Sequence, residues 1–260
     1  MASPKTAREE PSAGTGPRGG RGAMLLSVLV LLGLAVLLSL GFWQLHRLEW
    51  KREILARIGA NMNAAPLPLP PQSQWQALAQ AGNAYKKFEF RGEFDHSKEA
   101  LIFRAAGQRN LGPVYHILTP LRLADGSYVI VNRGFVPERF RDSAKRSAGQ
   151  VRGLVTVTGF LRLAERRNMF TPADAPDKRV WYSRDPMAIA RHFKLAKASP
   201  FVIDADATAS PGGWPKGGVT SIRGIPNNHL SYAWTWFGLA ATLAGVYIVL
   251  LWRRRSLAAN

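Results

Sequence analysis

The stretch "NNHLSYAWTWF" (227–237) places a histidine at the start of a long apolar run. Pro226 interrupts the chain before it, and Asn227 or Asn228 suits the N-cap, so we expect His229 in the first turn of a helix. The unpaired N–H groups and the positive end of the helix dipole favour a neutral imidazole there. A neutral imidazole is the form that ligates a metal.

Aromatic side chains share the predicted helical face of His229. Spacings of three, four and seven residues put Tyr232, Ala233 and Trp236 beside it. Tyrosine, tryptophan and histidine also form the belt that anchors membrane helices at the level of the lipid headgroups. The segment alone therefore leaves two interpretations open, an interfacial anchor and a ligand site.

Similar residues stand at the end of an earlier apolar stretch: Trp43, Gln44, His46 and Arg47. If the two stretches are helices that pack together, His46, an aromatic wall and a cation lie at the depth of His229. Such a place suits a flat apolar cofactor with acidic groups at one edge. Haem, whose iron takes an axial histidine, is one candidate, and ubiquinone, which needs no metal, is another.

Two uncharged stretches would form the helices that carry these residues. Neither residues 23–46 nor residues 230–252 contain Asp, Glu, Lys or Arg. Each stretch exceeds the roughly 20 residues that cross a bilayer, and we predict transmembrane helices at 23–43 and 229–252. The first stretch is too long for the apolar part of a secretory signal, and no cleavage site follows it.

The basic residues after the second stretch indicate the orientation. Three arginines at 253–255 predict a cytoplasmic C-terminal tail, 253–260. Two crossings then place the N-terminal tail 1–22, whose composition is typical of disorder, in the cytoplasm and residues 44–228 outside it. Two glutamates among the first ten residues argue against a mitochondrial transit peptide, so we expect the inner (cell) membrane of a bacterium.

The overall charge and the missing motifs exclude several function classes. The formal net charge is +18, and its scatter over the central segment favours anionic lipid or an acidic partner, and no nucleic acid. With no cysteine and five scattered methionines, copper delivery is disfavoured, because Cu(I) prefers soft ligands. No G-x-S-x-G or H-E-x-x-H motif occurs, and His96 and His116 are expected to be structural.

The central segment is predicted to form an extracytoplasmic α+β domain built on an antiparallel sheet or a small β-barrel. The first helix should continue out of the membrane and stop at "APLPLPPQS" (65–73), because proline cannot propagate a helix. "DPMAIARHFKL" (185–195) predicts one short helix, and "ASPGGWPKGGV" (209–219) predicts a loop. Strands are expected at 86–94, 100–103, 151–163, 179–183 and 200–204, and twice within 112–137 around an Asp-Gly turn.

A compact motif, "VNRGFVP" (131–137), ends one of these strands. Gly134 is expected at a bulge or turn, and Pro137 at the end of the strand. Asn132 and Arg133 either satisfy buried carbonyls, which we favour, or present a binding edge. The motif alone does not separate these two roles.

Four blocks in order resemble the signature stretches of the Surfeit locus protein 1 family. Each block alone is weak, but the ordered set is specific and lies between two membrane helices, as in the family. Gly92, in the second block, matches a glycine position where a side chain is excluded. The blocks are "LGFWQLHRLEWK" (40–51), "RGEFDHSKEALIF" (91–103), "VNRGFVP" (131–137) and "NNHLSYAWTWFGLA" (227–240).

The resemblance implies a non-enzymatic assembly factor for haem-copper cytochrome c oxidase. Such a factor binds haem a at the outer membrane face and helps to insert it into the large oxidase subunit. Its implied partners are that subunit, other oxidase assembly factors and membrane lipid. The matching motifs imply His229 as the axial ligand of the haem iron, and our hypothesis for Arg47 is that it pairs with the propionates. The implied haem-binding residues are His229, Tyr232, Trp236, Trp43 and Arg47.

Two other function classes compete with haem binding. One is a scaffold that binds no cofactor and stabilises oxidase assembly intermediates through its basic external domain. The other is a membrane enzyme acting on a quinone, which the lack of an acid–base pair at the depth of His229 disfavours. The effect of His229→Ala on oxidase assembly distinguishes haem binding from the scaffold.

Overall fold

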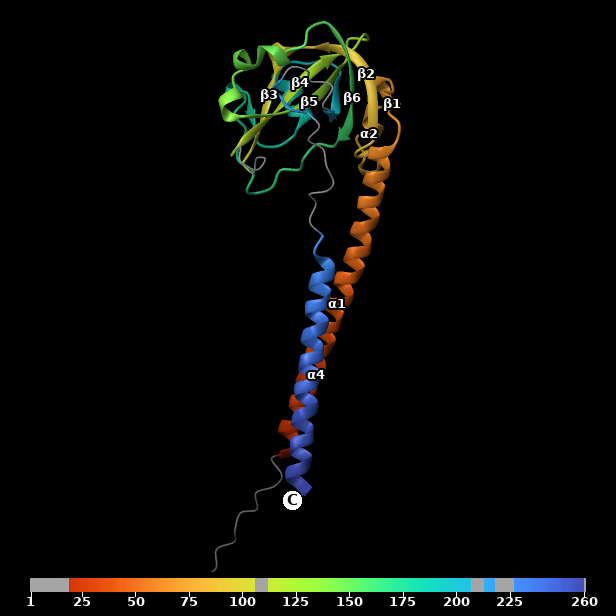
Figure 1. The fold of residues 1–260 in the computed structure, drawn as a ribbon, viewed down its shortest axis with the longest axis vertical. Coiled ribbons are helices and arrows are strands. Elements are labelled where there is room, and N and C mark those ends of the chain that lie inside the picture. The colour runs from red at the N-terminus through yellow and green to blue at the C-terminus, as the bar shows by residue number, and fades with distance from the viewer. Residues whose placement is uncertain (1–18, 106–111, 207–212, 218–226, 260) are drawn as a thin grey trace, which may run out of the picture. The chain divides into compact units, whose positions relative to one another are not determined.

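The computed structural model describes residues 19–105, 112–206, 213–217 and 227–259 of the chain. These residues fall into two compact units, one containing most of α1 with α4, and the other spanning Ile54–Ile225 (Figure 1). Most of the predicted tail 1–22 and much of the predicted loop 209–219 lie outside the described residues. The helices are α1 (Gly19–Asn63), α2 (Trp75–Leu78), α3 (Pro186–His192) and α4 (His229–Ala259).

Helices α1 and α4 are long and apolar enough to cross a membrane. Their most apolar windows have mean hydropathies of 2.8 and 1.7, and only 6% of each window is buried, unlike the core helix of a soluble protein. The chain is therefore a membrane protein. Helix α1 continues unbroken to Asn63 and ends just before the proline-rich stretch, as predicted. Helix α4 runs through the three arginines at 253–255.

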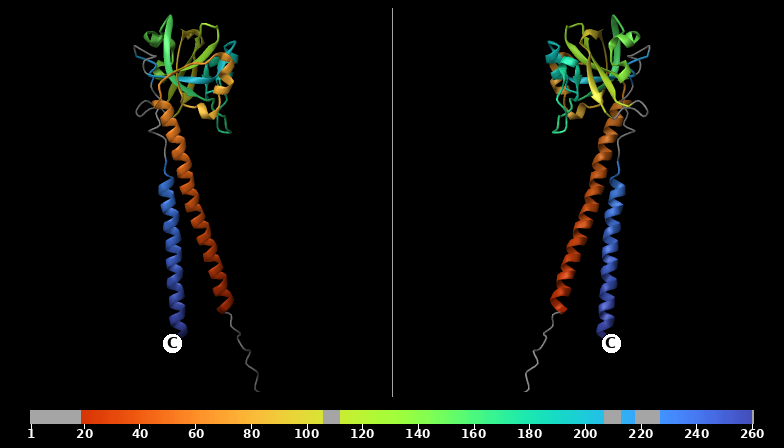
Figure 2. Two further views of the ribbon diagram at one scale, coloured as in Figure 1. Left: turned by 90° about the vertical axis from the view of Figure 1, so that its right-hand side faces the viewer. Right: turned by 90° about the vertical axis from the view of Figure 1, so that its left-hand side faces the viewer.

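The second unit is built on a closed β-barrel, which can be followed from two sides in Figure 2. The barrel order is β2-β6-β8-β5-β4, and an antiparallel pairing of β2 with β4 closes it. β1 pairs beside β2, while β3 and β7 extend the sheet beyond β4. The strands are β1 (Leu67–Pro68), β2 (Lys87–Phe94), β3 (Ala100–Arg104), β4 (Val114–Arg122), β5 (Tyr128–Pro137), β6 (Leu154–Arg162), β7 (Val180–Trp181) and β8 (Ala198–Ala205).

Every predicted strand segment contains a strand, and the small-barrel alternative is confirmed. The pairing is mixed, because β1–β2, β3–β7 and β5–β8 are parallel while the remaining pairs are antiparallel. The predicted Asp-Gly turn joins β4 to β5, with Gly126 at φ +77°, a value that glycine adopts without strain. Parallel β8 follows α3 in the chain, so a crossover connection rather than a hairpin delivers it to β5.

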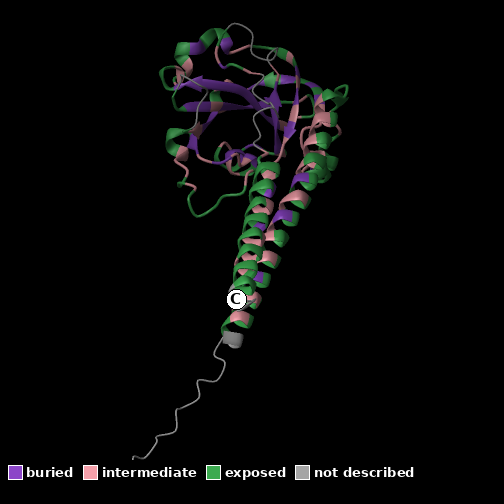
Figure 3. Cartoon of the chain, turned by 60° about the horizontal axis from the view of Figure 1, so that its bottom comes forward, coloured by how far each residue is buried: buried purple, intermediate pink, exposed green. Residues whose placement is uncertain are grey.

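Side chains from the barrel strands form one buried cluster in the barrel interior. Figure 3 colours most of these strands as buried. Strand β2 alternates buried and exposed residues, so one face, carrying Phe88, Phe90 and Phe94, points into the core. Helix α2 adds Trp75, which is 2% exposed and packs edge-on against Phe201 with ring centroids 5.8 Å apart. The barrel is thus a packed core rather than a channel.

Strand β5 is buried along nearly its whole length, and α3 packs on its outer face at Ile130. The predicted helix at 185–195 is confirmed as α3, and the carboxylate of Asp185 accepts the amide N–H of Ala188 at 2.9 Å. Ile189 packs from α3 onto the sheet in the same buried cluster as Ile130 of β5. The burial of β5 therefore has different causes along the strand, because Ile130 lies under α3 whereas Val136 packs in another cluster with Val180 and Phe140.

Candidate functional site

A seven-residue spacing organises the contact between α1 and α4. Steps of three and four residues connect the less exposed positions of both helices, an average of 3.5 that is typical of two helices packed along their length. In α1 the stripe contains Ser27, Val30, Leu34, Leu37, Gly41, Gln44 and Leu48. In α4 it contains His229, Ala233, Trp236, Ala240, Leu243 and Tyr247.

Small residues and ring contacts bring the two helices together. A Cβ atom on Gly41 would lie 2.5 Å from Cε1 of Phe237, so only glycine permits this approach without movement of the ring. Phe42 and Phe237 pack edge to face with centroids 5.4 Å apart. One polar contact also joins the pair, between Ser27 Oγ and the Tyr247 hydroxyl at 2.5 Å. The stripe is therefore a packed interface, and residues on it have restricted side chains.

His229 lies at the first position of α4, as predicted, and its side chain reaches α1. The amide N–H of Tyr232 donates to the carbonyl of Asn228 at 3.2 Å, which makes Asn228 the N-cap. His229 Nδ1 lies 2.8 Å from Oε1 of Gln44. Because an amide oxygen only accepts, Nδ1 carries a hydrogen, and in the neutral ring Nε2 is the nitrogen with the lone pair.

The Nε2 atom of His229 forms no hydrogen bond within the described part of the chain. A histidine that ligates a metal commonly donates its other ring N–H to an oxygen, which fixes the tautomer and the ring orientation. Gln44 gives His229 that arrangement. Two residues before His229, the side-chain oxygen Oδ1 of Asn227 is buried and accepts no hydrogen bond from any described residue. The start of α4 thus holds two acceptor atoms that receive no hydrogen bond from the part of the chain that the structure describes.

The other predicted site residues are distributed around this contact. Trp236 lies half-buried on the stripe. Trp43 and Tyr232 lie off it, with 56% and 55% of their surfaces exposed. Arg47 is exposed, and its guanidinium carbon lies 3.8 Å above the ring of Trp50. The structure therefore brings His229 and Trp236 onto the packed stripe, while the other three face outward beside it.

Gln44 is the functional candidate to which the sequence alone assigned no role. Its position was detectable, because Gln44 stands three residues after Gly41 and four before Leu48, both of them buried. That spacing places Gln44 on the stripe that faces α4. The contact between His229 and Gln44 also depends on the position of α1 along the axis of α4. The spacing of residues within one helix does not determine that position.

The chain is similar to known proteins over the residues that form this site. The SURF1 family profile matches residues 31–241, which include both ends of the His229–Gln44 contact. The chain belongs to the SURF1 family. It is 35% identical to Surfeit locus protein 1 of Mus musculus over 242 residues, which cover 88% of this chain and 76% of that protein. A SURF1-like protein of Monosiga brevicollis is also 35% identical over 242 residues, 89% and 88% of the two chains. Surfeit locus protein 1 of Homo sapiens is 34% identical over 217 residues, 78% and 70% of the two chains.

The donor set fits the axial ligation of haem that the SURF1 resemblance implied. One imidazole with an oriented ring and an available nitrogen is what a single axial iron bond requires. Exposed aromatic faces on both helices, at Trp43 and Tyr232, offer apolar contact to a flat ring.

In this SURF1-family chain, Gly92 lies where the barrel closes. A Cβ atom there would be 2.4 Å from the carbonyl oxygen of Arg122 and 2.4 Å from Cδ2 of Leu121. The next two residues of β2 pair with β4 and complete the barrel. The expected exclusion of a side chain therefore has a structural cause, because β2 and β4 approach each other closely here.

The motif at 131–137 contains a β-bulge, as predicted. Between the pairs His116–Phe135 and Leu118–Asn132, two residues of β5 oppose one of β4. Gly134 lies in the bulge at φ +116°, and a Cβ atom there would be 2.0 Å from the backbone oxygen of Lys216. A glycine is thus required both by its backbone conformation and by space.

The two polar residues of this motif have different roles. Arg133 donates to the buried carbonyl of Gly149, which confirms the favoured prediction. For Asn132 that prediction is wrong, because its amide donates to Oδ1 of Asp204 at 2.8 Å and its oxygen accepts the N–H of Gly134 at 3.1 Å. The side chain of Asn132 therefore joins the N–H of Gly134, within the bulge, to the carboxylate of Asp204 on β8.

Glu99 is the centre of a buried charged cluster with Arg133, Arg146 and His96. The two carboxylate oxygens lie 3.0 and 2.6 Å from Nη1 and Nη2 of Arg146, and Arg133 lies 3.5 Å away. Burial alone would raise the pKa of Glu99, but contacts with His96, Arg146 and Arg133 lower the pKa from 4.5 to about 2. Burial lowers the pKa of Arg133 to about 10, so it stays charged at neutral pH.

The two histidines expected to be structural each have hydrogen-bond partners. His96 Nε2 lies 2.8 Å from the carbonyl oxygen of Val151, to which it donates. His116 accepts from the amide of Asn132 at 3.3 Å. Burial lowers the pKa of His116, so the ring is neutral at neutral pH.

Proposed function

We propose that this chain is an assembly factor for haem-copper cytochrome c oxidase that binds haem a through His229 and helps to insert it into the large oxidase subunit. The observation that supports this most is the single imidazole whose Nδ1–H is held by Gln44, leaving Nε2 available at the end of two packed membrane helices. Membership of the SURF1 family supports it independently. On this proposal the chain itself catalyses no reaction.

Each residue of the proposed haem site has a separate task. His229 Nε2 supplies the axial ligand, and the rings of Trp43, Tyr232 and Trp236 supply apolar contact. Arg47 would pair with the propionates after leaving the ring of Trp50, a cation–π contact worth about 0.5–1 kcal/mol at an exposed site. A bound haem a would supply only the iron that accepts the imidazole, because it is cargo rather than a resident cofactor.

The proposed location is the inner membrane of a bacterium, with both termini in the cytoplasm and the barrel domain in the periplasm. The arginines that end α4 support this orientation, since positive charge next to a span is retained on the cytoplasmic side. The proposed partners are the large oxidase subunit, other oxidase assembly factors and membrane lipid.

Complementation of a deletion strain tests the proposal. His229→Ala is expected to reduce assembled oxidase at least about tenfold, because the ligand bond is lost, while the variant protein remains in the membrane. His192→Ala, which removes an imidazole from α3, is the matched control and should restore oxidase fully. Normal oxidase levels with His229→Ala would contradict the proposal.

The scaffold remains the second candidate, and the basic excess of the external domain favours it. It predicts the opposite pattern in the same strain. Reversal of exposed charges on the barrel domain would then abolish assembly, whereas His229→Ala would leave assembly intact. A protein that fails with both kinds of variant would combine the two roles.

A further inference from the structure

An open pocket of about 380 Å³ lies in the barrel domain, apart from the residues proposed for haem. Four chain segments line it: the start of β3, the 3₁₀ turn Glu138–Phe140, the irregular 3₁₀ segment Ser143–Gly149, and the residues around the 3₁₀ turn Pro176–Lys178. This volume is typical of a small-molecule site rather than of an interface with another folded protein.

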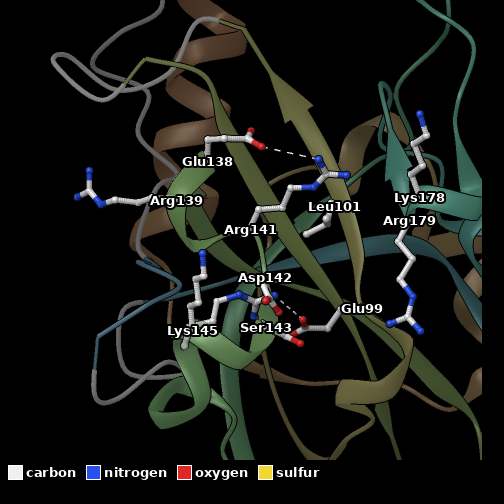
Figure 4. A pocket seen from close by; sticks show the side chains of 11 residues that line it. Glu99, Leu101, Glu138, Arg139, Arg141, Asp142, Ser143, Lys145, Lys178 and Arg179 are labelled. Carbon is white, nitrogen blue, oxygen red and sulfur yellow. Dashed lines mark hydrogen bonds and ion pairs between the residues drawn. The ribbon is translucent and has the colours of Figure 1, made fainter.

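Basic side chains dominate the lining of this pocket. Figure 4 shows Arg141 and Arg179 on either side of Leu101, and Lys145 beside Asp142, while Arg139 extends away from Leu101. Within the described residues, Lys145 and Arg179 form no ion pair with a carboxylate. Arg141 has only a loose one, at 3.7 Å, to exposed Glu138.

Two of the three acidic residues of the lining already have close partners. Glu99 is paired with two buried arginines, which leaves an excess of positive charge at the base of the pocket. Asp142 accepts the amide N–H of Ala144 at 3.0 Å and so caps the segment that follows it. Six basic side chains line the pocket against three carboxylates, so the net field in the pocket is positive.

The walls are fixed before any ligand arrives. Arg146 is bidentate to Glu99, and its Nε donates to the carbonyl of Phe140 at 3.1 Å. These bonds join both 3₁₀ segments to the start of β3. Arg141 lies over the ring of Tyr115 at 5.2 Å, which limits its side-chain freedom. A preformed site loses less entropy on binding than a mobile cluster of surface lysines.

We propose that this pocket binds the phosphate group of a small anionic ligand. A carboxylate carries one negative charge, which one guanidinium neutralises. Arg141, Arg179 and Lys145 together suit an oxyanion with a charge near −2, such as phosphate. The phosphate could belong to a soluble molecule or to a lipid headgroup, and both present the same chemistry. The proposal concerns a different part of the chain from His229 and does not depend on haem binding.

Isothermal titration calorimetry of the full-length protein in neutral detergent at low ionic strength tests this proposal. The probes are inorganic pyrophosphate, dihexanoylphosphatidic acid and, as a blank, dihexanoylphosphatidylcholine. The double variant R141A/K145A is expected to raise the Kd at least about tenfold, since two charge-assisted contacts are lost. R152A/R191A removes two exposed arginines outside the pocket and should change the Kd less than about twofold.

Each outcome decides the proposal. Tighter binding of pyrophosphate identifies a soluble phosphate ligand, and tighter binding of phosphatidic acid identifies a lipid headgroup; either supports the site if R141A/K145A weakens it. No binding of either probe to the wild type overturns the proposal, and so does equal binding by the double variant. Binding of hexaglutamate alone would also overturn it, because the pocket would then receive an acidic protein segment.

Discussion

Two polar groups of the chain, Glu99 and His229, differ in how completely they are hydrogen-bonded. Glu99 in the barrel domain is buried and has two arginines on its oxygens. Among the described residues, the ring of His229 at the start of α4 has one hydrogen-bond partner, Gln44, which contacts one of its two nitrogens. Both side chains are held in position by their contacts, but only His229 keeps an atom, Nε2, that can still bind a ligand.

This difference separates a structural polar group from one prepared for a ligand. A buried charge without partners is costly, so a fully paired cluster such as that of Glu99 serves the fold and its loops. In His229 one ring nitrogen fixes the orientation of the ring, and the other nitrogen can still bind a ligand. A ring nitrogen able to ligate a metal is therefore expected at the start of α4 and not in the Glu99 cluster.

The largest effect is predicted for Glu99→Gln. It leaves Arg133 and Arg146 buried without a counter-charge, which should lower the free energy of unfolding by about 3–5 kcal/mol. Urea unfolding of the full chain in detergent, followed by circular dichroism, measures it. Glu93→Gln, at an exposed position of β2, should cost less than about 0.5 kcal/mol. Equal costs for the two variants would show that the Glu99 cluster is not structural.

The same carboxylate predicts a pH dependence of stability. The pKa of Glu99 is lowered from 4.5 to about 2, so its contribution is complete above pH 4.5 and is lost as the pH falls toward 2. The loss should reach about 3 kcal/mol across that window. Urea titrations at several pH values measure it, and in Glu99→Gln this component should be absent. A wild-type curve identical to that of the variant would contradict the assignment.

Glycine substitutions compare the rigidity of the two regions. Gly92→Ala drives a Cβ atom into backbone at the barrel closure and should cost about 1–3 kcal/mol. Gly41→Ala meets only the ring of Phe237, which can rotate, so a cost below about 1 kcal/mol is expected. Gly82→Ala, with open space around it, is the control. A Gly41 variant less stable than the Gly92 variant would reverse the comparison.

Gln44→Leu tests the orientation of the histidine. It removes the acceptor for Nδ1–H while keeping the side chain's bulk, and loss of such an outer-shell partner typically weakens ligation 10–100-fold. Haem a titration of the purified protein measures the change. Gln44→Glu, which keeps an acceptor oxygen, should retain most of the affinity. If both variants bind haem a as the wild type does, Gln44 does not prepare His229.

The sequence predicted the elements of this fold better than their assembly. The alternation in β2, the Asp-Gly turn at Gly126 and the Asp185 cap are local signals, and each produced the expected element. The parallel pairing of β5 with β8 depends on contacts between residues about 70 positions apart. Such pairings follow from how the core packs as a whole, which no local pattern contains.

The candidate site was predictable to a similar degree. The composition of "NNHLSYAWTWF" and the family resemblance were sufficient to select His229. The outward position of Tyr232 was not evident from the sequence. In two helices packed at 3.5 residues per turn, the position four residues after His229 faces the partner helix, whereas Tyr232, three residues after it, lies to one side. The pairing of Glu99 with Arg146, 47 residues away in the chain, could not be read from spacing at all.

The most direct test of the account is an optical spectrum with pigment extraction. The full-length protein would be purified in detergent from cells that make haem a, beside His229→Ala and His46→Ala. Because His46 is exposed and no described residue hydrogen-bonds its ring, His46→Ala is the matched control. The account predicts near-stoichiometric haem a in the wild type and in His46→Ala, and its loss in His229→Ala. Equal haem a in the wild type and His229→Ala, or none in either, would contradict it.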